Sequence, residues 1–135
     1  MDEGYHMKIL IADDHVMIRR IIKQILVRNY PFATIAEADN GHSLVSKATS
    51  DEWDIVISDI SMPGMDGLDA LREIKKHSPT LPVLILSNYS EEVYVRRALK
   101  AGATGYVYKG MIHEELGSGV RKIMAGRNYV SPLYF

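Results

Sequence analysis

Short apolar runs alternate along the chain with longer segments in which apolar residues recur every three or four positions. The short runs span residues 7–12, 33–38, 54–59, 81–86 and 106–108. Several are rich in β-branched residues and all are too short for a typical helix, so they predict buried strands. The longer segments, such as the one from Ile18 to Leu26, carry charged residues opposite the apolar ones, which is typical of amphipathic helices.

Turn and capping residues separate these elements and fix their order. Pro31 ends the first helix, since the residue before a proline avoids the helical region. Asn40 and Asp66 stand where helix N-caps are expected, and Gly102 follows the fourth helix as a C-terminal stop. Strand and helix alternate about five times, which predicts an α/β fold: a doubly wound parallel sheet with helices on both faces. Only residues 127–135 fall outside this pattern.

Polar side chains close most of the predicted strands. Asp13 and Asp14 follow the first strand, Asp59 the third, Ser87 the fourth and Lys109 the fifth. Parallel strands place their carboxyl ends at one edge of the sheet, so these side chains should meet there. Three carboxylates in one pocket repel each other, and a divalent cation with oxygen ligands, Mg²⁺ or Mn²⁺, would relieve that repulsion. A lysine and a hydroxyl beside the cation would complete a cradle for phosphoryl oxygens.

Each of these residues also admits a simpler structural role. Asp13 and Asp14 could cap a helix, Asp59 could accept loop N–H bonds, Ser87 could form a turn, Lys109 could be a solvated charge, and Tyr106 could be a packing residue. Their occurrence together at the strand ends favours the functional interpretation.

Composition narrows the classes of protein that remain. With 135 residues and 47% hydrophobic content, the chain predicts one domain with a substantial core. Sixteen basic and seventeen acidic residues leave a net charge of −1 without charge runs, which disfavours a nucleic-acid surface. The chain has no cysteine and no apolar stretch long enough to cross a bilayer, so we expect a soluble, cytoplasmic protein without a membrane partner.

In these motifs the chain resembles the receiver domains of two-component response regulators. The resemblance rests on Asp13-Asp14, on Asp59 followed by residues 61–67, on Ser87, and on residues 101–109. Residues 126–132, Gly-Arg-Asn-Tyr-Val-Ser-Pro, are similar to NarL/FixJ-type (LuxR-like) members. The resemblance implies a flavodoxin-like (CheY-like) fold with five parallel strands in the order 2-1-3-4-5.

The resemblance also implies a phosphoacceptor and its metal. Asp59 would accept a phosphoryl group from a phosphohistidine of a sensor histidine kinase. Asp14 and Asp59 would bind Mg²⁺ (or Mn²⁺) through their side chains, Ser61 through its backbone carbonyl, and Asp13 through a metal-bound water. The metal would cancel the repulsion between the anionic nucleophile and the anionic phosphoryl group.

Further roles follow from the same resemblance. Lys109 and Ser87 would contact the phosphoryl oxygens, and Tyr106 would turn inward when Ser87 moves, as a two-state switch. Apart from the resemblance, Ser61 stands two residues after Asp59 and Tyr89 two residues after Ser87. We hypothesise that they flank the route of attacking water and set the lifetime of the phosphorylated state.

The function implied is a phosphorylation-switched receiver rather than an enzyme acting on external substrates. Such receivers normally control a helix-turn-helix DNA-binding domain, and DNA would be a partner only through that domain, which these 135 residues do not contain. We therefore expect residues 1–6 to be a disordered head, 7–127 the receiver domain, and 128–135 the start of a linker in a truncated chain. A possible homodimer would use Gly117-Ser118-Gly119 as a close-approach surface.

Three other interpretations stay open from the sequence. The chain could be a stand-alone receiver, or a pseudo-receiver that binds a partner without being phosphorylated, although its complete acid set disfavours the latter. A haloacid-dehalogenase-type phosphatase also uses a strand-end Asp nucleophile and Mg²⁺. That class needs a second acid two residues after the nucleophile, where Ser61 stands here.

Overall fold

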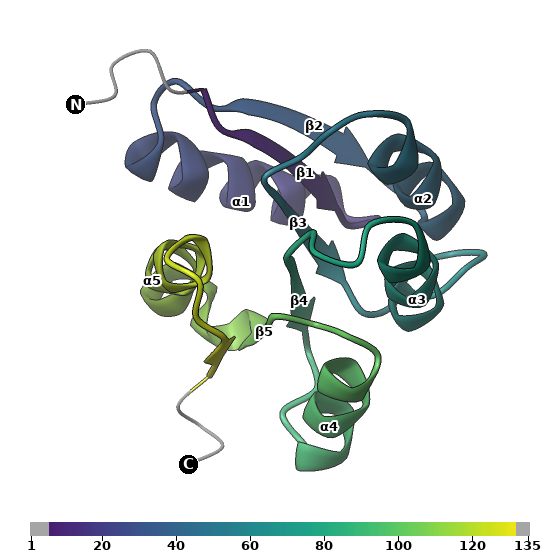
Figure 1. Cartoon of the computed structure of the whole chain (residues 1–135). Coiled ribbons are helices and arrows are strands. Elements are labelled where there is room, and N and C mark those ends of the chain that lie inside the picture. The colour runs from purple at the N-terminus through teal and green to yellow at the C-terminus, as the bar shows by residue number, and fades with distance from the viewer. Residues whose placement is uncertain (1–5, 132–135) are drawn as a thin grey trace.

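Six parallel strands form the centre of the structure, a computed structural model that describes residues 6–131 (Figure 1). The strands are β1 Lys8–Ala12, β2 Thr34–Ala38, β3 Ile55–Asp59, β4 Val83–Ser87, β5 Gly105–Tyr108 and β6 Tyr129–Val130. Their order in the sheet is β2-β1-β3-β4-β5-β6, with every neighbouring pair parallel. The predicted doubly wound sheet and the order 2-1-3-4-5 are thus confirmed, with one strand added at the edge.

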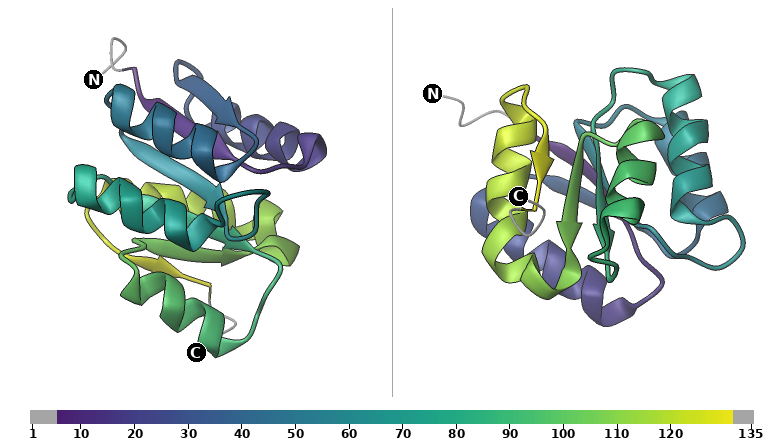
Figure 2. Two further views of the ribbon diagram at one scale, coloured as in Figure 1. Left: turned by 90° about the vertical axis from the view of Figure 1, so that its right-hand side faces the viewer. Right: turned by 90° about the horizontal axis from the view of Figure 1, so that it is seen from below.

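Helices cover both faces of this sheet (Figure 2). They are α1 Val16–Asn29, α2 Gly41–Ser50, α3 Gly67–His77, α4 Glu92–Lys100 and α5 Ile112–Met124, with a 3₁₀ turn, η1, at Lys109–Met111 before α5. One apolar core lies between the sheet and α1 and α5, and a second lies between the sheet and α2, α3 and α4. Because β3 and β4 are buried on both faces, they appear in the sequence as continuous apolar runs. No helix within residues 6–131 is long and apolar enough to cross a bilayer.

The predicted helix ends are confirmed at the residues that cause them. The Asn40 side chain accepts a hydrogen bond from the Ser43 amide, and the Asp66 side chain accepts one from the Asp69 amide. Each bond satisfies a backbone donor that the first helical turn leaves free. Gly102 follows α4 with a φ of 110°, a conformation that costs glycine little.

The prediction of five strands, with residues 127–135 outside the pattern, is wrong for Tyr129 and Val130. These two residues form β6, which pairs with β5 at the sheet edge. A two-residue strand is too short to show an alternating pattern, and the burial of the Tyr129 side chain holds it in place. The predicted head falls on residues 1–5 apart from His6, and much of the predicted linker falls on residues 132–135. Both stretches lie outside the described residues, so these domain boundaries stay predictions.

Gly117 and Gly119 of α5 allow other segments of the same chain to pack closely against this helix. A Cβ on Gly117 would lie 3.0 Å from the Asn29 side chain of α1, and a Cβ on Gly119 would lie 3.0 Å from the Tyr129 ring. The segments that pack closely against these two glycines are therefore α1 and β6 of the same domain. The homodimer expected at this surface stays a prediction.

Candidate functional site

The carboxyl edge of the sheet gathers the acidic residues that close β1 and β3. Ala12, the last residue of β1, is in register with Ser58 of β3, so Asp13 and Asp59 follow neighbouring positions of paired strands. Asp14 comes next in the chain, before α1 begins. The topology therefore brings Asp59 together with acids that lie 45 and 46 residues earlier in the sequence.

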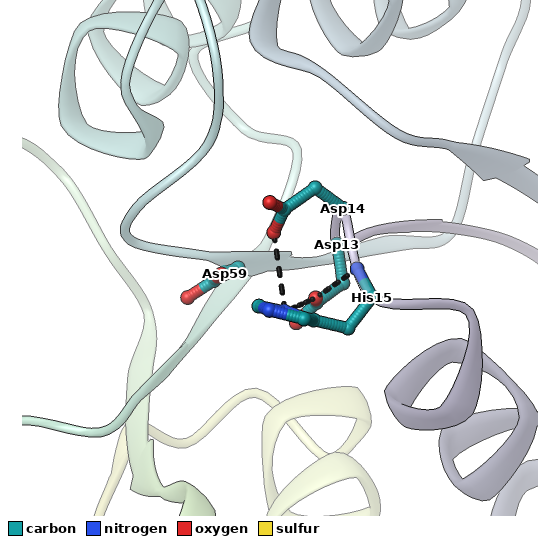
Figure 3. Close-up of side chains that lie close together, drawn as sticks. All are labelled: Asp13, Asp14, His15 and Asp59. Atoms are coloured by element: carbon teal, nitrogen blue, oxygen red, sulfur yellow. Dashed lines mark hydrogen bonds and ion pairs between the residues drawn. The ribbon is translucent and has the colours of Figure 1, made fainter.

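Four side chains form a tight cluster at this edge (Figure 3). One possible ligand atom from each of Asp13, Asp14, His15 and Asp59 lies within 4.8 Å of all the others. Asp13 and Asp59 are buried, whereas Asp14 and His15 are exposed to solvent. A cation that enters from solvent would therefore meet Asp14 first and the buried acids beneath it.

Lys109 supplies a positive charge to the buried part of the cluster. It follows β5 directly and is only 8% exposed. Its Nζ lies 2.7 Å from Asp13 Oδ2 and 3.2 Å from Asp59 Oδ2. The ammonium group thus bridges the two buried carboxylates, and the prediction that lysine and acids from separate strands meet at one edge is confirmed.

The charge state of Asp59 reflects this environment. Burial raises the pKa of the Asp59 carboxyl, and the neighbouring Asp13 carboxylate adds to the rise. The Lys109 ammonium and a hydrogen bond from the Ser61 amide act against it and lower the pKa. One lysine among three acids leaves the site short of positive charge, which is the condition in which a divalent cation binds favourably.

His15 belongs to the cluster although the sequence predicted no role for it. Its Nδ1 lies 3.0 Å from Asp13 Oδ1 and 3.2 Å from Asp14 Oδ1, and its amide donates to Asp13 Oδ1 at 2.8 Å. His15 is also the N-cap residue of α1, and its side chain makes no capping bond. The sequence signal that could have indicated this role is the position of His15 directly after Asp13-Asp14.

The simpler role of Asp13 and Asp14 as N-cap residues of α1 is wrong, because His15 occupies the N-cap position.

A cavity of about 350 Å³ opens beside the cluster. Its walls are Asp14, His15, Asp59, Ile60, Ser61, Met62, Pro63, Asn88 and Tyr89. These residues come from the loops that follow β1, β3 and β4, as expected for a ligand site in an open α/β sheet. The cavity is large enough for a metal ion and a phosphoryl group, and it gives both a path to Asp59.

Ser87, Tyr89 and Tyr106 are linked beside this cavity. The Ser87 hydroxyl accepts a hydrogen bond from the Tyr89 amide at 2.9 Å. The Tyr106 side chain is fully buried, and its hydroxyl donates to the Tyr89 carbonyl at 2.8 Å. Tyr89 also stacks on Tyr94 of α4, with ring centroids 4.3 Å apart. Tyr106 is therefore in an inward orientation, connected through the β4–α4 loop to Ser87.

The fold and this site together define a receiver-type signalling domain: a doubly wound sheet with an acid cluster and a lysine at its carboxyl edge. The response regulator receiver domain family matches residues 9–121. The chain belongs to that family, and it is the receiver domain of a two-component response regulator.

Curated relatives place it among response regulators of known type. Response regulator GacA of Pseudomonas aeruginosa is 33% identical over 125 residues, which cover 93% of this chain and 58% of that protein. Transcriptional regulatory protein DegU of Brevibacillus brevis is 34% identical over 93% of this chain and 53% of its own length. The chain thus spans little more than half the length of these relatives.

A solved structure agrees with this placement. The two-component response regulator of the LuxR family from Aurantimonas sp. SI85-9A1 superposes with a TM-score of 0.89 and is 30% identical. The match covers 95% of this chain and 91% of that one. The NarL/FixJ-type (LuxR-like) resemblance of the sequence is therefore confirmed.

Proposed function

We propose that Asp59 accepts a phosphoryl group from a phosphohistidine of a sensor histidine kinase. The observation that carries this proposal is the convergence of Asp13, Asp14, Asp59 and Lys109 beside a cavity that reaches Asp59. Asp59 is the nucleophile in this proposal: its carboxylate oxygen bonds to phosphorus as the P–N bond breaks, and the imidazole of the kinase histidine leaves.

The same residues suit a divalent cation. The donor set is mainly oxygen, which favours Mg²⁺ or Mn²⁺. Asp14 and Asp59 would hold the ion through their side chains, Ser61 through its backbone carbonyl and Asp13 through a water. When bound, the ion supplies positive charge that offsets the repulsion between carboxylate and phosphoryl group.

Lys109 and Ser87 would stabilise the phosphoryl oxygens. Lys109 already lies against Asp59, so its ammonium group is placed to bind the negatively charged phosphoryl oxygens once the phosphoryl group is on Asp59. Ser87 would turn its hydroxyl from the Tyr89 amide toward the phosphoryl oxygens. Tyr106 is already inward while Ser87 still bonds the Tyr89 amide. The movement of Ser87 pulls on the loop that also holds the Tyr106 hydroxyl, and Tyr106 would act as the switch because phosphorylation stabilises this inward state against an outward one.

Two residues would set how long the phosphorylated state lasts. Ser61 and Tyr89 lie in the wall of the cavity, where they flank the approach of water to Asp59. A small residue on one side and a large aromatic on the other would admit water from only one direction.

The wider role follows from the longer relatives. DegU is named a transcriptional regulatory protein, and we propose that this receiver controls a DNA-binding output domain in a longer protein, where it also forms a homodimer. In that arrangement the receiver is cytoplasmic, the sensor histidine kinase acts on it there, and DNA is contacted only by the output domain.

The test is phosphorylation of the 135-residue chain by acetyl phosphate, followed by intact-mass measurement. With Mg²⁺ we expect one added phosphate, and without a divalent cation we expect none. Asp59→Asn should take up no phosphate, because the amide is not a nucleophile of comparable strength. Asp39→Asn, an exposed acid after β2, is the matched control and should behave like the unmodified chain. Metal-independent labelling, or labelling that persists in Asp59→Asn, would refute the proposal.

A further inference from the structure

Residues Tyr129 to Ser131 lie along β5 as a short added strand. The Tyr129 amide donates to the Thr104 carbonyl at 3.1 Å, and the Ser131 amide donates to the Tyr106 carbonyl at 2.9 Å. The Ser131 hydroxyl accepts from the Tyr108 amide at 3.2 Å. The segment thus satisfies backbone groups on both sides of Tyr106.

A buried carboxylate on α5 anchors this segment. Glu115 is 6% exposed, and its Oε1 accepts hydrogen bonds from the Ser131 hydroxyl at 2.5 Å and the Tyr129 hydroxyl at 3.1 Å. Lys122 Nζ lies 5.3 Å from the centre of the Tyr129 ring. Acids are rarely buried unless they are paired or hydrogen-bonded. Glu115 takes no part in the acid cluster at Asp59, so its burial needs a separate explanation.

Two glycines leave room for the same tyrosine. A Cβ on Gly119 of α5 would lie 3.0 Å from the Tyr129 ring. A Cβ on Gly105 of β5 would lie 2.9 Å from the Tyr129 carbonyl oxygen, and closer still to the Leu84 and Ile123 side chains, at 2.5 and 2.8 Å. Contacts this short are tighter than ordinary packing allows. Gly105, Glu115, Gly119 and Lys122 therefore form a shaped seat for Tyr129, which we call the tyrosine seat.

The residues that follow Tyr129 in the strand pair with Tyr106, the proposed switch residue. Val130 is in register with Tyr106 and packs against the same apolar core. The Ser131 amide holds the Tyr106 carbonyl while the Tyr106 hydroxyl is held by the Tyr89 carbonyl. A change in Tyr106 therefore alters the contacts of Val130, and release of Val130 removes a neighbour of inward Tyr106.

We propose that Tyr129–Ser131 is a docking strand held by Glu115, and that its docking and the inward state of Tyr106 stabilise each other. This inference rests on the proposed function, because it takes Tyr106 as the switch that responds to Asp59. Phosphorylation then tightens the strand in its seat, and the position from which the chain continues past Ser131 becomes fixed. Coupling of this kind is reciprocal: the factor by which a phosphoryl mimic at Asp59 favours strand docking is also the factor by which docking favours binding of the mimic. A loosened strand therefore weakens binding of a phosphoryl mimic at Asp59.

The experiment measures both ends of the coupling in the full 135-residue chain. Amide hydrogen exchange at positions 129 and 131 reports docking, with and without beryllofluoride and Mg²⁺, and calorimetric titration gives the affinity for beryllofluoride. Beryllofluoride should slow exchange at both positions in the unmodified chain. Glu115→Gln and Ser131→Ala should speed exchange there about tenfold or more, and should weaken beryllofluoride binding roughly 5- to 20-fold. Glu114→Gln, an exposed acid on the same helix, is the matched control and should change neither quantity.

Each other outcome counts against a specific part of the proposal. Unchanged exchange in Glu115→Gln would show that Glu115 is not the anchor, and faster exchange with unchanged beryllofluoride affinity would show that the seat is uncoupled from the switch. If either variant fails to fold, Tyr129→Phe, which loses a single hydroxyl, goes through the same measurements and should show smaller changes in the same direction. An unmodified chain that binds no beryllofluoride would refute the proposed function and the coupling, while the exchange data would still decide whether Glu115 anchors the strand.

Discussion

At the scale of single residues, Lys109 partly neutralises the negative charge of the acid cluster. It lies between two buried carboxylates, Asp13 and Asp59, at 2.7 and 3.2 Å. Removing one partner from a buried ion pair leaves an uncompensated charge, which typically costs 3–5 kcal/mol. The lysine is therefore part of the folded structure as well as of the proposed chemistry.

Lys109→Met should lower the free energy of unfolding by about 3 kcal/mol in the absence of divalent cations, because both carboxylates lose their counter-charge. Added Mg²⁺ should restore part of that loss. Urea unfolding with and without Mg²⁺ measures both effects. Lys100→Met, at an exposed position on α4, is the control and should change stability by less than about 0.5 kcal/mol. Equal losses in the two variants would contradict the proposed role of the Lys109 charge.

Tyr129 gives a second prediction at this scale. Burial raises the pKa of the Tyr129 hydroxyl from 10.0 to about 12, and the Glu115 carboxylate adds to the rise. The unfolded chain loses this proton near pH 10 while the folded chain keeps it, so the folded state binds more protons between pH 10 and 12. Stability from Tyr129 is therefore complete below pH 10 and falls by on the order of 2 kcal/mol as the pH rises to 12.

The measurement compares the unmodified chain with Tyr129→Phe, which lacks the ionisable hydroxyl. Because other tyrosines and the lysines also titrate at high pH, the informative quantity is the difference between the two stabilities at pH 9 and pH 11. That difference should shift in favour of Tyr129→Phe as the pH rises. A constant difference would mean that Tyr129 ionises as easily in the folded chain as in the unfolded one.

At the scale of elements, the sequence predicted the helices and the five longer strands because each carries a local cause. Pro31, Asn40, Asp66 and Gly102 act on their own neighbours, so their effects are visible in the sequence. No neighbouring residue in the sequence determines β6, because this strand depends on the tyrosine seat, which α5 and β5 form. Its two residues could be placed only once the tertiary contacts were known.

Gly67, at the start of α3, lets the helix pack directly against the backbone of Asp59. It is the first residue of α3, and its amide donates to the Ile60 carbonyl at 2.8 Å. A Cβ there would lie 2.2 Å from the Asp59 carbonyl oxygen. Gly67→Ala must therefore move the loop that carries Asp59 and Ser61, and should destabilise the domain by roughly 1–3 kcal/mol.

The same change should slow phosphorylation by acetyl phosphate at least tenfold, because the loop no longer presents Asp59 correctly. Thermal unfolding and intact-mass kinetics give the two values. Asp69→Ala alters an exposed side chain of the same helical turn and keeps its backbone amide, so it serves as the control. If Gly67→Ala were phosphorylated at the rate of this control, the close approach to Asp59 would have no functional importance.

At the scale of the whole molecule, topology assembles the site from distant parts of the chain. The sequence predicted that Asp13, Asp59 and Lys109 would meet, because the ends of parallel strands share an edge of the sheet. It did not predict the place of His15, whose side chain direction depends on the turn before α1. It also did not predict the burial of Glu115, because a charged residue on a helix is usually solvated.

The assembled site leads to a prediction about metal and stability. The unfolded chain does not hold Asp13, Asp14 and Asp59 together, so Mg²⁺ should bind only the folded state and stabilise it by mass action. At free Mg²⁺ tenfold above its Kd, the gain is about 1.4 kcal/mol. Thermal or urea unfolding over a Mg²⁺ series measures it, with ionic strength held constant by a monovalent salt. Asp14→Asn should abolish the gain, whereas Asp39→Asn, an exposed acid at the same edge of the sheet, should keep it. A gain that survives Asp14→Asn would mean that Mg²⁺ acts elsewhere on the protein, and the acid cluster would then no longer qualify as the metal site.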